Sequence, residues 1–220
     1  MYMPILVKLE GKKVLEVIIY IYMFIVGITL GSFYTLAVHR IPLKQDITHT
    51  RSYCPKCNHR LNFWDLIPVL SFLFLGGKCR YCKEKIRPRY MILEILSGII
   101  FLLFSLCLKI DLLQIEITKI VLLIFGIAFF STVFITIGIY KEHKGIQKSV
   151  FNFGIIVAII YMVYLYILNK SIYRYIIYVI TFLVMLLINN IRKTKEKLNT
   201  ISFIVFAIIN IVEIAIAILI

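Results

Sequence analysis

The sequence predicts an all-α polytopic membrane protein with about six transmembrane helices and a small cytoplasmic insertion between the first two. Composition is the first observation behind this prediction. Hydrophobic residues make up 61% of the 220 residues and the mean hydropathy is +0.95, whereas a soluble globular protein is about 45–50% apolar. The second and third observations are the long apolar runs and the basic segments between them. A soluble domain, a disordered chain and a collagen-like repeat are excluded.

Six apolar runs are long enough to cross a bilayer as helices, which takes about 20 residues each. None of them contains more than one charged residue. Their many Ile and Val residues would also suit strands, but such lengths without alternation favour helices. The expected spans are residues 17–38, 91–108, 120–140, 149–169, 175–191 and 198–220.

The basic residues predict which ends of the spans face the cytoplasm. The segments 39–90, 141–148 and 192–197 contain 18 of the 25 Lys and Arg residues, and the segments on the opposite side contain seven. Cytoplasmic loops carry the excess of Lys and Arg, so we expect 39–90 inside and both termini outside. This topology also accounts for the net charge of +14. Nucleic-acid binding is not expected, because no basic face with interleaved aromatic residues is evident.

Four cysteines of the cytoplasmic loop form two C-x-x-C pairs. Cys54 and Cys57 read C-P-K-C, Cys79 and Cys82 read C-R-Y-C, and 21 residues separate the pairs. Each pair can turn tightly and direct two sulfurs to one point, so together they predict a zinc-ribbon-like site with four thiolate ligands. Two disulfides or a redox pair are the alternative, but a cytoplasmic loop is kept reduced. A closed site leaves no open coordination position, which makes the expected zinc structural.

The stretch between the two pairs, residues 61–77, is strongly apolar for a cytoplasmic loop. Two interpretations stay open. The stretch is either a hairpin on the membrane surface, with Trp64 at the interface, or a small core packed beneath the zinc.

Two of the expected spans carry features beyond their hydrophobicity. Gly27 and Gly31 form a G-x-x-x-G motif, which lets another helix approach closely. Glu94 lies a few residues inside its span. A carboxylate inside a membrane is a candidate functional group, and pairing with Arg87 or Arg89 is the structural alternative.

Ordered motifs across the first two spans and the loop carry a family resemblance. They are GSF at 31–33, HRIP at 39–42, the two C-x-x-C pairs, DLIPVLS at 65–71, GGKCRYC at 76–82 and RYMILEILSG at 89–98. These motifs resemble the N-terminal part of the type IV prepilin peptidases. The resemblance implies a multi-pass protein of the bacterial plasma membrane that serves type IV pili or protein secretion. It also implies pilin-like substrates, leader cleavage by an aspartic-type endopeptidase, and N-methylation with S-adenosylmethionine.

The resemblance further implies two catalytic aspartates at cytoplasmic helix ends in the C-terminal half. One such carboxylate activates water and the other donates a proton. The chain has three aspartates: Asp46 and Asp65 lie in the cytoplasmic loop, and Asp111 is expected on the outer face. Tyr140 stands where the first catalytic Asp belongs. We therefore divide the chain into an N-terminal segment with the first span (1–38), the four-cysteine loop (39–90) and a membrane domain resembling a degenerate peptidase domain (91–220).

Glu142 and Glu196 are the catalytic candidates that remain near those helix ends. Lysines flank both, which favours the ionised form of each carboxyl group and leaves no proton donor. Three functions stay open: a divergent prepilin-processing enzyme, an enzyme that keeps only methyl transfer, and a non-catalytic substrate-binding or assembly protein of a pilin-like system. Pilin-like proteins and membrane lipid are the expected partners in each case.

Overall fold

The computed structural model describes residues 3–109, 116–143 and 147–168, with isolated positions beyond them; for residues 3–12 it describes the backbone. Within these ranges the regular elements are helices, together with two isolated β-bridges. The expected spans 175–191 and 198–220 lie outside the described ranges.

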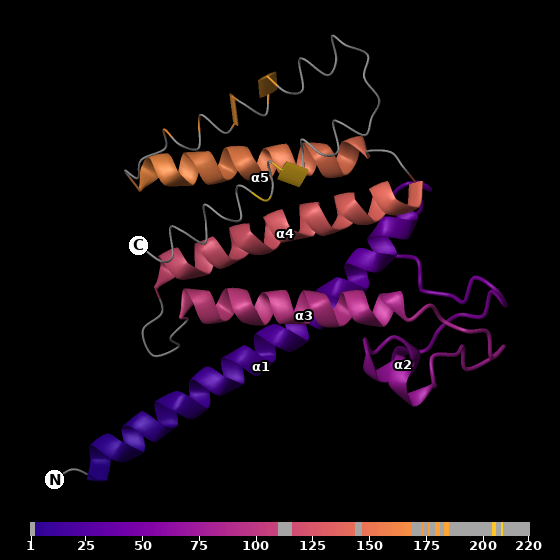
Figure 1. Cartoon of the computed structure of the whole chain (residues 1–220), viewed down its shortest axis with the longest axis horizontal. Helices are drawn as coiled ribbons and strands as arrows, with labels where there is room; N and C mark the ends of the chain where they lie inside the picture. Colours follow the sequence, from indigo (N-terminus) through magenta and orange to yellow (C-terminus); the bar gives the residue numbers. More distant parts are fainter. Residues whose placement is uncertain are drawn as a thin grey trace. The chain divides into compact units, whose positions relative to one another are not determined.

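Four long helices correspond to four of the six expected spans (Figure 1). Each contains an 18-residue window apolar enough to cross a membrane. The expectation of a mostly helical membrane protein is confirmed for this part of the chain, while the count of six spans stays a prediction. The helices are α1 (Met3–Arg40), α3 (Arg89–Leu108), α4 (Ile117–His143) and α5 (Lys148–Ile167).

The chain forms two compact units. The first comprises Met1–Ala37 and Gln45–Ile117, and so contains most of α1, the cysteine loop and α3. The second comprises Val38–Lys44 and Thr118–Ile220, and its described helices are α4 and α5. The predicted division at residues 38 and 90 stays a prediction.

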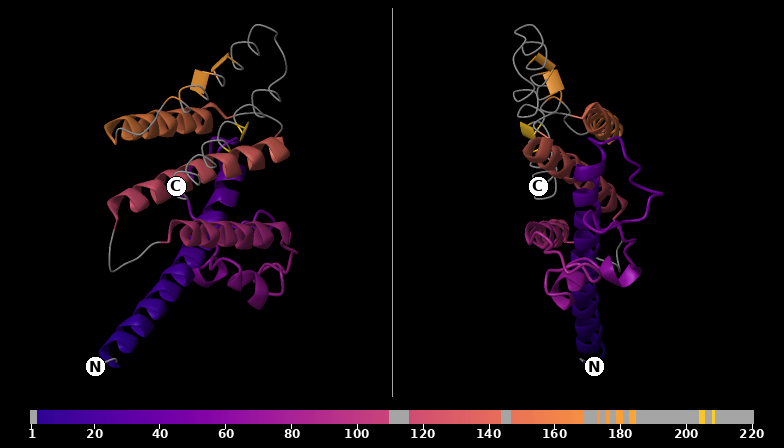
Figure 2. Two further views of the ribbon diagram at one scale, coloured as in Figure 1. Left: turned by 60° about the vertical axis from the view of Figure 1, so that its left-hand side comes forward. Right: turned by 90° about the vertical axis from the view of Figure 1, so that its right-hand side faces the viewer.

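Small residues bring α1 and α3 together where the two helices cross in the first unit (Figures 1 and 2). A Cβ added at Gly27 would lie 2.8 Å from the Cα of Gly98, and one added at Gly31 would lie 2.8 Å from the Cβ of Ser97. Real Cβ atoms essentially never approach other atoms so closely. The packing role predicted for the G-x-x-x-G motif is therefore confirmed.

In the second unit, α4 and α5 pack through aromatic rings. The ring centroids of Phe125 and Tyr161 lie 5.0 Å apart, and those of Phe129 and Tyr161 lie 6.1 Å apart. Phe129 and Tyr161 are each 1% exposed. Aromatic pairs at these separations contribute about 0.5–1.5 kcal/mol beyond the burial of their area.

Large apolar side chains cover the exposed surface of the long helices. On α3 they recur every three or four residues, as expected for one face of a helix that meets hydrocarbon. This surface, together with the apolar composition of the helices, makes the chain a membrane protein. The exposed side chains of α3 are Ile92, Leu96, Ile99, Leu103 and Leu106.

Candidate metal centre

The first C-x-x-C pair folds into a tight turn that backbone hydrogen bonds close. The amide of Asn58 donates to the carbonyl of Cys54 at 2.8 Å, and the amide of Cys54 donates to the carbonyl of His59 at 3.0 Å. An antiparallel bridge between Tyr53 and Arg60 flanks the turn. Asn58 adopts a φ of 55°, a left-handed conformation that asparagine tolerates better than most residues. The residue after the second cysteine thus reverses the chain.

The second pair repeats this turn. The amide of Lys83 donates to the carbonyl of Cys79 at 3.1 Å, and the amide of Cys79 donates to the carbonyl of Glu84 at 2.8 Å. A bridge between Lys78 and Lys85 flanks it, and Lys83 has a φ of 60°. In both turns the first cysteine is buried and the second is exposed, so each turn presents two sulfurs in the same way.

The two turns bring the four cysteine sulfurs together. All four Sγ atoms lie within 4.8 Å of one another, and the Sγ atoms of Cys54 and Cys82 are 3.8 Å apart. Four thiolates in tetrahedral geometry, each about 2.3 Å from one zinc ion, are about 3.8 Å from one another. The cysteines are free rather than disulfide-bonded. Cys54, Cys57, Cys79 and Cys82 are therefore close enough to hold a metal ion such as zinc.

The thiols affect one another's ionisation. A hydrogen bond from the backbone amide of Cys57 is the main cause that lowers the pKa of Cys54 to about 7. At Cys82 the amide of Glu84 acts to lower the pKa, but burial and hydrogen bonds with the other three cysteines outweigh it and raise the pKa to about 11. Thiols this close cannot all ionise without a cation among them. A divalent metal ion would supply that positive charge.

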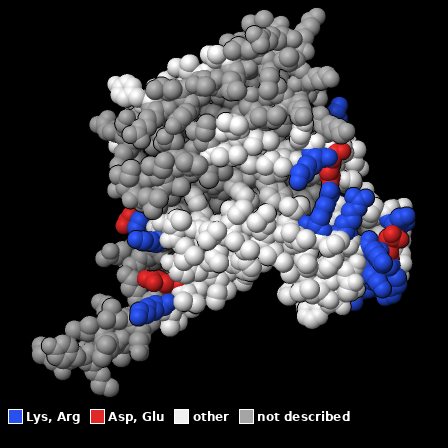
Figure 3. Space-filling model, viewed as in Figure 1, with Lys and Arg blue, Asp and Glu red and all other residues white. Residues whose placement is uncertain are grey.

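Basic residues surround the cysteines. The segment 39–90 contains 11 Lys and Arg residues and three acidic residues, and Figure 3 shows Lys and Arg gathered over the loop. Four thiolates on one zinc ion leave a net charge of two minus, which neighbouring cations offset. Those adjacent to the cysteines in sequence are Lys56, Lys78, Arg80 and Lys83.

An ion pair attaches the start of the apolar stretch to the second turn. Nε of Arg80 donates to Oδ1 of Asp65 at 2.6 Å, and the Asp65 side chain is 2% exposed. The other oxygen of Asp65 accepts the amide of Asn62 at 3.2 Å, and the Asn62 side chain donates to the hydroxyl of Tyr81 at 2.9 Å. Burial acts to raise the pKa of Asp65, but Arg80 and Asn62 hold it below its ordinary value. Asp65 is thus a structural residue.

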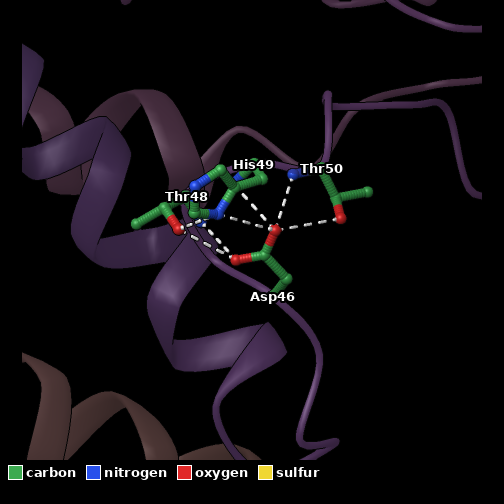
Figure 4. Close-up of polar contacts among 4 residues, drawn as sticks. All are labelled: Asp46, Thr48, His49 and Thr50. Atoms are coloured by element: carbon green, nitrogen blue, oxygen red, sulfur yellow. Dashed lines mark hydrogen bonds and ion pairs between the residues drawn. The ribbon is translucent and has the colours of Figure 1, made fainter.

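Asp46 has a local role (Figure 4). Its carboxylate accepts hydrogen bonds from the backbone amides of Thr48 at 2.9 Å, His49 at 2.8 Å and Thr50 at 2.9 Å. The bond from Thr48 is the main cause that holds the pKa of Asp46 well below its ordinary value. All three partners lie within four residues, so Asp46 closes a turn at the start of the loop.

Glu94 connects α3 to the loop. It is 8% exposed, its Oε2 accepts the backbone amide of Val69 at 2.8 Å, and the hydroxyl of Ser32 on α1 also bonds to it. Glu94 therefore bonds to Val69 and Ser32 rather than pairing with Arg87 or Arg89. Sequence reasoning missed these contacts, because a backbone amide as partner leaves no signal in the residue types.

The catalytic candidates are not brought together by the described residues. Glu142 lies in the last turn of α4 and is partly exposed. Glu196 lies outside the described residues, as does Asp111. A pair formed by Glu142 and Glu196 therefore stays a prediction.

Comparison with known proteins places the resemblance in the N-terminal half of the chain. Residues 25–108 match the model of the bacterial peptidase A24 N-terminal domain. The prepilin leader peptidase/N-methyltransferase of Myxococcus xanthus is 42% identical over 89 residues, which are 40% of this chain and 26% of that protein. The proteins of the same name from Vibrio cholerae and Bacillus subtilis are 42% and 46% identical over 86 and 79 residues. These stretches are 35% and 36% of this chain, and 34% and 32% of the relatives.

The matched stretch covers only part of this chain and only part of each relative. It covers between 26% and 34% of the length of these three relatives, and the region that would hold catalytic aspartates lies outside residues 25–108. No solved structure matches the chain. Within these bounds, the predicted similarity to the prepilin peptidases is confirmed: residues 25–108, with both cysteine turns and the crossing of α1 and α3, correspond to the N-terminal domain of that family.

Proposed function

We propose that this chain acts on type IV prepilins or pseudopilins at the cytoplasmic face of a bacterial plasma membrane. The match of residues 25–108 to the peptidase A24 N-terminal domain carries the proposal. Relatives named prepilin leader peptidase/N-methyltransferase share this stretch at 36–46% identity. Pilin-like proteins and membrane lipid are then its partners, and the excess of basic residues in 39–90 supports a cytoplasmic location of the loop.

We propose further that the four clustered cysteines hold a structural zinc ion. The sulfur separations support zinc, and four protein thiolates would complete its coordination without a position for water or substrate. The ion would cross-link the two turns, and through Asp65 and Arg80 it would also position the apolar stretch between them. Zinc-dependent folding of this kind is usual in modules too small to form an apolar core.

Leader cleavage by this chain alone is not part of the proposal. Aspartic peptidase chemistry needs one ionised carboxylate and one protonated carboxyl group side by side. Tyr140 occupies the place of the first Asp that the resemblance implies, and a phenol does not carry the charge that a carboxylate carries at neutral pH. The loss of catalytic groups that act as a unit lowers rates by several orders of magnitude.

Two activities remain compatible with the missing Asp pair. One is N-methylation of a pilin-like protein with S-adenosylmethionine, as the printed name of the relatives includes a methyltransferase. The other is a non-catalytic role, in which the chain binds a pilin-like substrate or assists its assembly. The missing Asp pair does not distinguish between them, because neither activity requires two aspartates.

Mass spectrometry of one reaction separates these functions. The full chain, purified in detergent, is incubated with S-adenosylmethionine and a prepilin peptide that contains leader and membrane segment. We expect the leader to remain on this peptide. A second peptide, supplied without the leader, should either gain the mass of one methyl group or stay bound and unchanged. The Vibrio cholerae relative serves as the positive control. Leader loss at a comparable rate would refute the proposal and make Glu142→Gln and Glu196→Gln the next variants to test.

A further inference from the structure

We propose that the segment formed by η1 (Phe63–Asp65), α2 (Leu70–Phe74) and the residues between them inserts into the lipid interface and sets the depth of the cysteine loop at the membrane. We call it the η1–α2 segment. The inference concerns lipid contact, so it stands or falls separately from the activity proposed above.

The η1–α2 segment exposes large apolar side chains. The sequence allowed either a surface hairpin or a core packed beneath the cysteines, and a packed core requires these side chains to be covered. No apolar residue of either element is buried. A contiguous group of exposed large apolar residues indicates contact with another apolar medium. The most exposed are Phe63 at 74%, Trp64 at 70%, Leu73 at 60% and Phe74 at 85%.

A hydrogen bond to α3 fixes the level of this segment. Figures 1 and 2 show α2 beside the N-terminal end of α3, and the amide of Val69 donates to Glu94 at 2.8 Å. Glu94 lies five residues beyond Arg89, the first residue of α3, which is about 7.5 Å along the helix axis. The headgroup layer on each side of a bilayer is about 5–7 Å deep. With Arg89 placed at the water-facing edge of the headgroup layer, Val69 lies where headgroups meet acyl chains.

The backbone at Val69 supports a fixed position. Val69 has a φ of 62°, a conformation that is costly for a β-branched residue. Such a conformation persists where surrounding contacts impose it. The bond to Glu94 is one such contact, so the start of α2 is held against the membrane helix.

Charge complementarity identifies the occupant as a lipid surface. The acid of the segment, Asp65, is neutralised by Arg80, and Figure 3 shows an uncharged surface over α2 beside gathered Lys and Arg. Apolar side chains at this depth enter the acyl boundary, and basic residues beside them attract anionic headgroups. The basic residues that follow the segment are Lys78, Arg80, Lys83, Lys85 and Arg87.

Trp64 reports the location of the segment without labelling, because it is the single tryptophan of the sequence. The full chain is reconstituted into phosphatidylcholine–phosphatidylglycerol vesicles with iodide on both sides of the membrane. We expect blue-shifted emission, weak quenching by iodide and strong quenching by lipids brominated near the top of the acyl chain. Free quenching by iodide would overturn the proposal. Shielding from both quenchers would also overturn it, because it would show burial against protein.

Two matched pairs of variants test the mechanism. Glu94→Leu removes the acceptor for the Val69 amide and should increase iodide quenching of Trp64, whereas Glu94→Gln keeps an acceptor oxygen and should not. If the Glu94→Leu protein does not insert into vesicles, a combined variant with Leu73→Ser and Phe74→Ser replaces it. This variant leaves α1 and α3 unchanged, and Trp64 quenching is again measured. It should lose quenching by brominated lipid, and Leu43→Ser, 49% exposed in the wild type, should not. Unchanged quenching in the combined variant would refute lipid insertion.

Discussion

The cysteine loop and the pair of helices α4 and α5 are stabilised by different interactions. In the loop, backbone hydrogen bonds close both cysteine turns and Arg80 pairs with Asp65, while large apolar side chains stay exposed. In α4 and α5 the stabilising contacts are apolar and aromatic, and Phe129 and Tyr161 are almost completely buried. The loop thus depends on a few specific polar and sulfur atoms, and the helix pair depends on packing.

This difference makes the two regions respond differently to substitution. A packed helix pair tolerates exchange among apolar residues of similar volume. A loop without an apolar core has no such reserve, so we expect the loss of one of the proposed metal ligands to remove a large share of what holds it together. The family match at residues 25–108 includes this loop and leaves out α4 and α5.

Loss of zinc is the change with the largest expected effect. Structural zinc contributes about 10–16 kcal/mol to the folding of zinc-finger peptides. We expect about one zinc per chain in the wild type. Cys54→Ser or Cys79→Ser should release the metal and make residues 45–88 sensitive to protease, without cleavage in α4 or α5. Mass spectrometry of metal content and of the proteolytic fragments measures both effects.

Cys107→Ser is the control for this experiment. Cys107 is an exposed thiol on α3, outside the clustered four, and its replacement should leave the zinc content unchanged. Stoichiometric zinc in both Cys54→Ser and Cys79→Ser would show that the ion is held elsewhere.

Overpacking the crossing of α1 and α3 should have the next largest effect. A leucine at Gly27 would meet Gly98 and Phe101, which lie 2.8 Å from an added Cβ. Forcing side chains into a closely packed contact typically costs about 1–3 kcal/mol, so Gly27→Leu should lower the Tm in detergent. Thr29→Leu places the same side chain at an exposed position of α1 and should leave the Tm nearly unchanged. Equal Tm values for the two variants would show that the glycine is not needed for packing.

The extent to which sequence predicted this molecule depends on the range of each interaction. The long helices and the cysteine turns could be predicted, because apolar runs and C-x-x-C spacing are local patterns. The bond between Val69 and Glu94 spans 25 residues and the bond between Asp65 and Arg80 spans 15. Neither follows from a local pattern, since each depends on where the folded loop places a backbone amide or a guanidinium group.

The apolar stretch illustrates the same limit. Its composition suited both a membrane-surface hairpin and a core beneath the cysteines, and composition alone does not distinguish them. The exposure of Phe63, Trp64 and Phe74 argues against the packed core, and that exposure is a property of the folded loop. For Glu142 and Glu196 the structure makes no such distinction. Glu196 lies outside the described residues, so their pairing stays a prediction.

Removal of the Asp65 charge should have the smallest effect of the three changes and the most local one. Asp65→Asn loses the ion pair with Arg80 but keeps the size of the side chain, so we expect faster protease cleavage of residues 61–77 with zinc still bound.

The lowered pKa of Asp65 means that the pair stabilises the loop fully above the ordinary carboxyl value of 3.8, and that this contribution is lost as pH falls through the lowered value. Wild type and variant should therefore differ at neutral pH and converge in strong acid. Asp46→Asn is the matched control, because it removes a carboxylate of the same loop that accepts hydrogen bonds from the amides of Thr48, His49 and Thr50, and its cleavage at 61–77 should match the wild type. If Asp65→Asn and Asp46→Asn were cleaved equally at neutral pH, the ion pair would contribute nothing specific to the apolar stretch, and the loop would depend on the proposed zinc ion and on backbone hydrogen bonds.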